Sequence, residues 1–353
     1  MALHLLYLPG DGIGPEIVSA TEAVLEAANA AFDLGLERSS MDIGFAALAA
    51  TGSTIPDDVI AAARKADGVI LGPVSHNAYP PVAEGGLNPS GVLRGSLDLY
   101  ANIRPARSRA GLPSPIARPV DLVVVRENLE GFYADRNMHL GPGEFMPEPG
   151  VALALRKITS RASARIARAA FALAEQRPAR KVAAVHKANV LRLSDGLFLA
   201  EVRAVAAQHP GVAYEEVLVD AAAALLVRDP GRFDVIVTTN MFGDILSDLA
   251  SELSGGLGLA ASLNLGPDFA VAQAQHGSAP DLAGQDRANP TSLIVSAAML
   301  LSHLGAIDAA EAIGSAVDEA LASAATRTAD LGGTLGCAAF GNHIANLIRD
   351  RAP

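Results

Sequence analysis

Residues 235–248 read VIVTTNMFGDILSD, and the character of the side chains changes once within this stretch. The first three are apolar and β-branched, as is typical of a strand that is covered on both faces. The second part suits a helix, on which Asp244 and Asp248 lie one turn apart on the same side. A buried strand that leads directly into a helix is the repeating unit of an α/β fold.

The same alternation extends outward along the chain, where short apolar runs are separated by alanine-rich stretches of helical period. It predicts an α/β fold with a mainly parallel sheet. In such sheets ligands bind beyond the carboxyl ends of the strands, and here Arg126, Lys187 and Asp220 each follow an apolar run. The predicted strands are residues 3–8, 69–71, 122–125, 182–185, 217–219 and 235–237.

Length and composition limit the classes of protein that this chain can represent. With 353 residues it should form two domains, or one core with a large inserted lobe. Its net charge of −11 disfavours nucleic acids and anionic membranes as partners. The single cysteine, Cys337, excludes an internal disulfide, and the N-terminus lacks a basic leader, so we expect a cytoplasmic protein. Residues 292–304 are apolar but too short to cross a membrane, which predicts a buried helix.

Two stretches rich in glycine and proline interrupt the α/β pattern, residues 77–91 and residues 141–150. Long loops in a compact fold are usually functional. We expect the second stretch to project from the body as an arm for a partner subunit.

The three acidic residues near strand ends suggest a metal site. Asp244 and Asp248 repel each other on one helix face unless a cation lies between them, and Asp220 would supply a third oxygen ligand. Such a set suits Mg²⁺ or Mn²⁺. The alternative is a helix N-terminus whose acids only complement the helix dipole.

Several arginines stand close together in a chain that is acidic overall. Arg94 and Arg104 fall within LRGSLDLYANIRP, and Arg126 follows the next predicted strand. Guanidinium groups bind carboxylates through two parallel hydrogen bonds, so a di- or tricarboxylate is the expected ligand. A solvated basic surface is the alternative.

Two further side chains are candidates for proton transfer. Burial or a neighbouring cation would allow Lys187 to act as a general base, and Tyr133 could donate a proton. The ordinary alternatives are a surface lysine and a buried structural tyrosine.

Two glycine-containing segments are candidates for cofactor contact. GDGIGPE, residues 10–16, follows a strand and opens a helix at Pro15, but its glycine spacing differs from the G-x-G-x-x-G of a Rossmann fold, so its glycines should allow a tight turn or close backbone packing. HGSAPDLAGQDRANP, residues 276–290, carries Asp281, which would accept hydrogen bonds from a ribose diol and repel a 2′-phosphate. That loop favours NAD over NADP.

Taken in order, these motifs resemble those of the β-decarboxylating dehydrogenases, the isocitrate/isopropylmalate dehydrogenase family. The matching segments are GDGIGPE, LRGSLDLYANIRP, VRENLEGFY, HKANVL, VDAAA, FGDILSDL, HGSAPDLAG and ANP, which run from Gly10 to Pro290. The resemblance implies a two-domain fold that is not a Rossmann fold. A discontinuous cofactor domain would span residues 1–100 plus 254–353, and a middle domain would span residues 101–253, with a dimer arm near residues 132–155.

The resemblance also implies a role for each matching residue. Tyr133 and Lys187 would be catalytic, and Tyr133 would protonate C3 after decarboxylation. Lys187, Asn189 and Asp220 would reach the site from the second subunit of a homodimer. The implied substrate-binding set is Ser90, Arg94, Arg104, Arg126, Tyr133, Lys187 and Asp220; the cofactor set is Asn189, His276, Gly277, Ala279, Asp281 and Asn289; and the metal set is Asp220, Asp244 and Asp248.

The predicted activity is NAD-dependent oxidative decarboxylation of a 3-substituted (2R)-malate-type acid with Mg²⁺ or Mn²⁺. In LNPSGVLR, residues 87–94, Leu87, Ser90 and Arg94 would share one helix face, with Ser90 nearest the substrate. Isopropylmalate enzymes of the family tend to have apolar side chains here, so the polar Asn88 and Ser90 favour a polar or small third substituent. The alternative is that Asn88 and Ser90 only cap the helix. A 3-isopropylmalate dehydrogenase proper, a non-catalytic regulatory subunit and a purely nucleotide-binding protein are the other hypotheses. The chain departs from the family pattern at residues 273–275, where members usually have Glu-Pro and an apolar residue.

Overall fold

The computed structural model describes residues 3–133, 138, 141 and 143–351. The chain divides into two compact units, and each is described by itself. Unit 1 comprises Met1–Leu97, Arg109–Pro113 and Gly256–Pro353, and unit 2 comprises Asp98–Ser108 and Ser114–Gly255. None of the helices in the described ranges is long and apolar enough to span a membrane.

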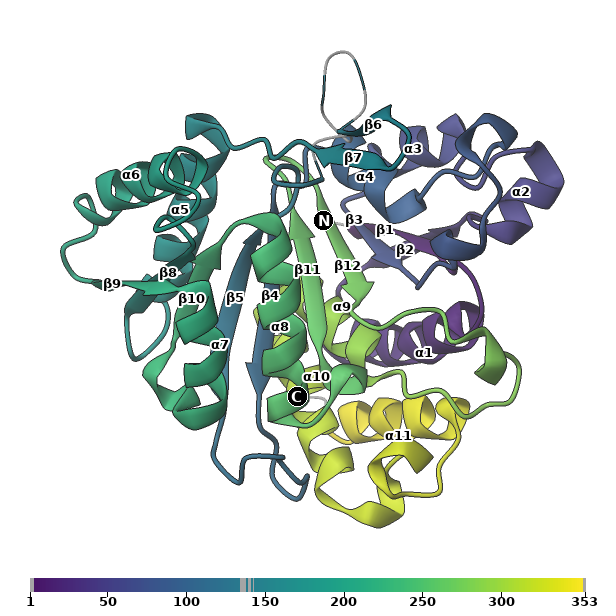
Figure 1. Cartoon of the computed structure of the whole chain (residues 1–353). Coiled ribbons are helices and arrows are strands. Elements are labelled where there is room, and N and C mark those ends of the chain that lie inside the picture. Colours follow the sequence, from purple (N-terminus) through teal and green to yellow (C-terminus); the bar gives the residue numbers. More distant parts are fainter. Residues whose placement is uncertain (1–2, 134–137, 139–140, 142, 352–353) are drawn as a thin grey trace. The chain divides into compact units, whose positions relative to one another are not determined.

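Unit 1 is built on strands in the order β2-β1-β3-β12-β11, of which β2, β1, β3 and β12 run parallel and β11 runs antiparallel to β12. Helices α1, α9, α10 and α11 supply most of its apolar core, and α1 and α11 lie side by side (Figure 1). The strands are β1 (Leu3–Leu8), β2 (Leu36–Ser40), β3 (Gly68–Leu71), β11 (Ala261–Leu265) and β12 (Ala270–Ala274). The helices are α1 (Gly14–Phe32), α2 (Phe45–Thr51), α3 (Asp57–Ala63), α4 (Pro89–Ser96), α9 (Thr291–His303), α10 (Ile307–Ala322) and α11 (Cys337–Arg349).

The glycine-rich turn after β1 brings two backbone segments of unit 1 together. Gly12 has a φ of +57°, and a Cβ atom there would lie 2.0 Å from the carbonyl oxygen of Ser278. Only glycine tolerates this approach. Pro15 follows in the first turn of α1. The predictions of close backbone packing and of a helix with Pro15 near its first position are both confirmed.

Unit 2 is built on strands in the order β4-β5-β10-β8-β9. Strands β5, β10, β8 and β9 run parallel, and β4 runs antiparallel to β5. Helices α7 and α8 cover one apolar face, while α5 packs against β5, β10 and β8. The strands are β4 (Ala101–Arg107), β5 (Asp121–Glu127), β8 (Lys181–His186), β9 (Ala213–Leu218) and β10 (Val235–Thr238), and the helices are α5 (Ser160–Glu175), α6 (Ser194–Ala206), α7 (Val219–Arg228) and α8 (Asn240–Ser254).

Together the two units confirm the predicted α/β architecture with a mainly parallel sheet. The buried helix predicted over residues 292–304 is α9. One boundary is corrected: β9 ends at Leu218, so Val219 and Asp220 begin α7 and Asp220 is a helix residue. In unit 2, Arg126, Lys187 and Asn240 all lie where the parallel strands β5, β8 and β10 end, at one edge of the sheet.

The two predicted interruptions contain more regular structure than expected. Within residues 77–91, the first turn of α4 begins at Pro89, and 3₁₀ turns occupy His76–Ala78 and Val82–Glu84. Within residues 141–150, β6 (Glu144–Glu148) forms an exposed antiparallel hairpin in unit 2 with β7 (Val151–Ala154) (Figure 1). Part of the predicted arm, residues 134–137, 139–140 and 142, lies outside the described residues.

Candidate active site

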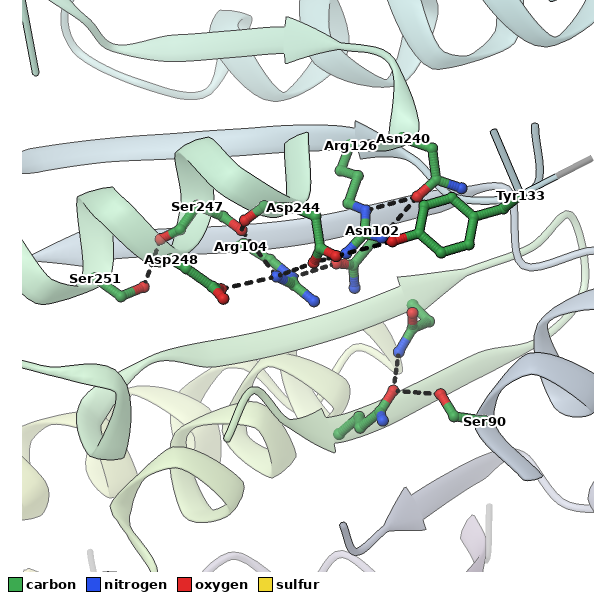
Figure 2. A network of polar contacts seen from close by, with 12 residues as sticks. Ser90, Asn102, Arg104, Arg126, Tyr133, Asn240, Asp244, Ser247, Asp248 and Ser251 are labelled. Atoms are coloured by element: carbon green, nitrogen blue, oxygen red, sulfur yellow. Dashed lines mark hydrogen bonds and ion pairs between the residues drawn. The ribbon is translucent and has the colours of Figure 1, made fainter. Parts of the chain in front are cut away.

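Two arginines and two aspartates form an ion-pair cluster in unit 2 (Figure 2). Nη1 of Arg104, on β4, lies 3.2 Å from Asp244 Oδ1 and 3.3 Å from Asp248 Oδ1, both on α8. Nη1 of Arg126, on β5, also pairs with Asp244 Oδ1. The arginine side chains are only 8% and 2% exposed, whereas those of Asp244 and Asp248 are 36% and 51% exposed. The arginines therefore do not form a solvated basic surface, and the i, i+4 placement of the aspartates on a helix is confirmed.

Arg126 is fixed by the start of α8. Asn240 Oδ1 accepts hydrogen bonds from Nε at 2.9 Å and from Nη2 at 2.6 Å, and Asn240 is fully buried. A Cβ atom on Gly243 would lie 2.6 Å from Arg126 Cγ, so the absence of a side chain at residue 243 makes the space that Arg126 occupies. The first turn of α8 thus holds the Arg126 guanidinium in one orientation.

Arg104 has its own set of neutral partners. Its Nε donates to Asn102 Oδ1 at 2.5 Å, and its Nη1 donates to Ser247 Oγ at 2.8 Å. Burial, together with the nearby charge of Arg126, lowers the pKa of Arg104 to about 10, and the two aspartates oppose this shift. The guanidinium stays charged at neutral pH, as carboxylate binding requires.

Tyr133 joins this cluster from the segment after β5. Its hydroxyl donates to Asp244 Oδ2 at 3.2 Å, and the Arg126 guanidinium lies 5.8 Å from the centre of its ring (Figure 2). The candidate proton donor is therefore in contact with one proposed metal ligand and one proposed carboxylate-binding residue.

Lys187 and Asp220 pair with each other. The Lys187 ammonium group donates to Asp220 Oδ1, and the two side chains are 27% and 64% exposed. This hydrogen bond is the main reason why the pKa of Asp220 is lowered. The charged partner that the structure gives Lys187 is thus an acid. Asn189, two residues further on, is exposed.

The proposed metal ligands fall into two places in unit 2. Asp244 and Asp248 approach one nitrogen atom of Arg104, so two carboxylates converge there, and both are accessible enough to bind a hard divalent ion. The described residues contain no group of three or more acidic, histidine or cysteine side chains suited to a metal, so Asp220 does not complete a three-ligand site with them. Within one chain, therefore, only Asp244 and Asp248 of the three proposed metal ligands lie together in the described residues.

In unit 1 the predicted substrate residues Ser90 and Arg94 are linked through Gln273. Gln273 Oε1 accepts from Ser90 Oγ at 3.2 Å, from Arg94 Nη2 at 3.3 Å and from Asn264 Nδ2 at 3.3 Å. Asn88 is the N-cap of α4 and accepts from Gly91 N, as the alternative stated. Ser90 does not cap the helix. Leu87 precedes α4, so the prediction that it shares a helix face with Ser90 and Arg94 is wrong.

The predicted cofactor loop, also in unit 1, has features that suit a nucleotide. Burial lowers the pKa of His276, and its Nε2 is buried without a hydrogen-bond partner in the described part of the chain. Ala279 has a φ of +36°, which turns the backbone into the 3₁₀ helix Pro280–Leu282 with Asp281 exposed. Beside it, Gly277 lines a pocket of about 350 Å³. A neutral imidazole in need of a partner and an accessible carboxylate fit an NAD molecule.

Asn289 is occupied by contacts within unit 1. Its Nδ2 donates to Asp330 Oδ2 at 3.0 Å, and its Oδ1 accepts from Thr291 N at 3.0 Å. The structure therefore gives Asn289 a role in holding the end of the loop to the start of α9.

Comparison with known proteins points to the family that the sequence motifs resemble. A sequence profile of the family described as Isocitrate/isopropylmalate dehydrogenase matches residues 4–344. The chain belongs to this family. It is 42% identical over 344 residues to 3-isopropylmalate dehydrogenase of Archaeoglobus fulgidus, with 98% of this chain and 99% of that protein covered. It is 43% identical over 351 residues to the Isocitrate/homoisocitrate dehydrogenase of Thermus thermophilus, with 99% of each covered. The crystal structure of isocitrate dehydrogenase from Methylococcus capsulatus has a TM-score of 0.89 at 39% identity and covers 98% of this chain and 99% of that one.

The match to this family confirms the resemblance that the motifs indicated. The family comprises decarboxylating hydroxy-acid dehydrogenases. Four residues that orient Arg104 and Arg126 were not predicted from the sequence, namely Asn102, Asn240, Gly243 and Ser247. Asn102 carried a signal, because it stands two residues before Arg104 and so shares a face with it if the segment is a strand.

Proposed function

We propose that this chain is an NAD-dependent dehydrogenase that oxidises and decarboxylates a 3-substituted (2R)-malate-type acid. The observation that carries the proposal is the cluster in which Arg104 and Arg126, both buried, meet Asp244 and Asp248, both accessible. Rigid guanidinium groups suit a substrate with two or more carboxylates. Adjacent aspartates suit Mg²⁺ or Mn²⁺, which when bound would act as a Lewis acid toward the substrate's oxygen atoms.

The chain's own side chains divide the remaining work. Arg94, Arg104 and Arg126 bind the carboxylates and so orient C2 and C3. Lys187, in its neutral amine form, accepts the proton of the C2 hydroxyl, and Tyr133 returns a proton to C3 once CO₂ has left. The contact between Tyr133 and Asp244 supports this assignment, because it keeps the phenol beside the group proposed to hold the metal.

For the cofactor we propose NAD, held by the loop that begins at His276. Ala279 turns the backbone of the loop and Gly277 lines the adjacent pocket. Asp281 accepts hydrogen bonds from the ribose diol, and Asn289 holds the loop's end. Asn189 would contribute from a second subunit. The exposed carboxylate of Asp281 supports NAD over NADP because it would repel a 2′-phosphate.

The proposed assembly is a homodimer in which Lys187 and Asp220 serve the site of the partner. Two observations support it. Among the described residues of one chain, Asp220 does not form a three-ligand group with Asp244 and Asp248. Large apolar side chains are also exposed beside these groups, with Val190 66%, Leu193 90% and Ile245 59% exposed. The hairpin β6–β7 exposes others, Phe145 and Met146 among them.

The third substituent of the substrate is proposed to be polar or small. Ser90 is buried and its hydroxyl contacts the amide of Gln273, so the surroundings of Arg94 in unit 1 are polar. An isopropyl group against such groups would cost about 1–3 kcal/mol if it left them unpaired. A 3-isopropylmalate dehydrogenase proper is the second candidate, since the Archaeoglobus fulgidus relative carries that name.

The decisive experiment measures NADH formation and CO₂ release by the purified full chain with D-malate, isocitrate and 3-isopropylmalate. We expect the two products in a one-to-one ratio, dependence on Mg²⁺ or Mn²⁺, and activity lost in Arg126→Met. Arg161→Met is the matched control, because Arg161 is an exposed arginine on α5. No turnover with any of the three acids would refute the proposal and favour a regulatory subunit. A preference of about a hundredfold or more for 3-isopropylmalate would refute a polar substituent.

A further inference from the structure

A buried ion pair in unit 2 lies next to Lys187 but takes no part in the proposed chemistry. Asp195, in the first turn of α6, is fully buried, and its Oδ1 lies 2.7 Å from Nη1 of Arg156, whose side chain is 8% exposed. The other carboxylate oxygen, Oδ2, accepts a hydrogen bond of 2.5 Å from the backbone N–H of Lys187. Asp195 therefore connects the Arg156 guanidinium to the backbone of the proposed base.

The same guanidinium also contacts the start of α8. Its Nη2 donates to Thr239 Oγ1 at 3.0 Å, and Thr239 is the N-cap residue of the helix that carries Asp244. The guanidinium lies 5.6 Å from the ring centre of Phe242 and 5.9 Å from that of Phe132, so aromatic rings enclose it.

The position of Arg156 in the chain adds a third connection. It follows β7 by two residues, and the next residue, Lys157, makes a backbone bridge to Gly131. One side chain thus joins the base of the exposed hairpin, the turn that carries Lys187 and the N-terminus of α8.

Energetics argue against a purely stabilising role for this pair. Burying two charges costs desolvation energy that their mutual attraction repays only in part, so replacement by apolar residues of similar size is often neutral for stability. We infer that Arg156 and Asp195 are positioning residues that hold the Lys187 backbone in the orientation its role as a base requires, an inference that rests on the proposed function.

The test compares Arg156→Met with the double variant Arg156→Met/Asp195→Leu. The single variant leaves Asp195 buried without its charge partner, so both Tm and kcat should fall. The double variant removes both charges, so its Tm should recover part of the loss, although the hydrogen bonds of Arg156 and Asp195 are gone. Its kcat should stay at least tenfold lower with KM changed less than threefold, because no acceptor remains for the N–H of Lys187.

Arg156→Lys is the conservative rescue, because it keeps a cation beside Asp195. Its kcat should lie within about threefold of the wild type. A double variant with wild-type kcat and KM would overturn the inference. So would equal losses of kcat in Arg156→Lys and Arg156→Met, a result that does not depend on whether the double variant folds.

Lys187→Ala, measured alongside, separates this inference from the proposed function. If Lys187→Ala retains its activity within about threefold, the role of Lys187 as a base is wrong and the positioning inference fails with it, while the proposed overall reaction is not refuted. If Lys187→Ala is inactive while the double variant is fully active, the proposed function stands and only the positioning inference is overturned.

Discussion

Gly243→Ala tests how closely α8 is fitted to Arg126. The added Cβ would lie 2.6 Å from Arg126 Cγ, 2.7 Å from Arg126 Cβ and 3.2 Å from Thr238 Cγ2. A new rotamer of Arg126 cannot relieve the second contact, because the position of a Cβ atom is set by the backbone, here that of β5. The helix or the strand must therefore shift.

Two opposing effects decide the change in stability. Alanine is more favourable than glycine inside a helix by about 1 kcal/mol. Overpacking of a tight site costs about 1–3 kcal/mol. We expect a net loss of up to about 2 kcal/mol in the free energy of unfolding. The effect on catalysis should be larger, since a displacement of about 1 Å at a site that orients substrate can cost about 10²-fold in rate.

Gly314→Ala is the matched control. Gly314 lies in the interior of α10, and a Cβ there would have no heavy atom within 4 Å. It should gain about 0.5–1 kcal/mol with kcat/KM unchanged. Urea unfolding and steady-state kinetics measure both quantities. If Gly243→Ala gains as much stability as Gly314→Ala and keeps the wild-type kcat/KM, the close fit between α8 and Arg126 is refuted.

Four further predictions follow from the structure and the proposed function. Burial raises the pKa of Glu127 to about 7 from 4.5, so its ionised form is disfavoured in the folded state. The free energy of unfolding should therefore fall by about 3 kcal/mol as pH rises through this window, and Glu127→Gln should lack that fall in urea titrations at about pH 5 and about pH 8. Lys187→Ala should lower kcat by about 10²–10⁴-fold with NAD binding, measured by calorimetry, unchanged; a loss under threefold would contradict the role. Asp244→Asn combined with Asp248→Asn should abolish metal-dependent turnover, and wild-type activity that persists in excess chelator would exclude the metal. Asp281→Lys should narrow the preference for NAD, an expectation that fails if the wild type already has an equal or higher kcat/KM with NADP.

Most of the secondary structure was predictable because it depends on periods that a single sequence displays. The apolar run at residues 235–237 marked β10, and the spacing of Asp244 and Asp248 placed them on one face of α8. Asp220 was misassigned to a strand end because the apolar residues of β9 continue without a break into α7. No turn residue marks that boundary.

The close approach of Arg104 and Arg126 could not be predicted from local pattern. They lie on neighbouring antiparallel strands, and the register pairs Asn102 with Arg126 and Arg104 with Val124. A register of this kind depends on the packing of both strands against α8 and on the length of the connecting segment. The family resemblance supplied both arginines as candidates. It did not predict that both would pair with the same oxygen atom of Asp244.

The neutral residues around the arginines were missed for a related reason. Asn240 looks from the sequence like a helix-start residue, yet its side chain is buried and accepts two hydrogen bonds from Arg126. The N-cap of α8 is Thr239, so capping does not account for Asn240. A buried amide that accepts from a buried guanidinium becomes visible only when the strand and the helix are packed together.

The burial of Arg126 and Arg104 is itself an argument for a ligand. An ion pair that is hidden from water contributes little net stability, and apolar residues of similar volume could often replace it without loss. In this cluster the two arginines are buried, whereas Asp244 and Asp248 are accessible to solvent. A cation at Asp244 and Asp248 would draw these carboxylates away from the arginines. The guanidinium groups, already desolvated and held by Asn102 and Asn240, would then bind the carboxylates of a substrate with little further reorganisation.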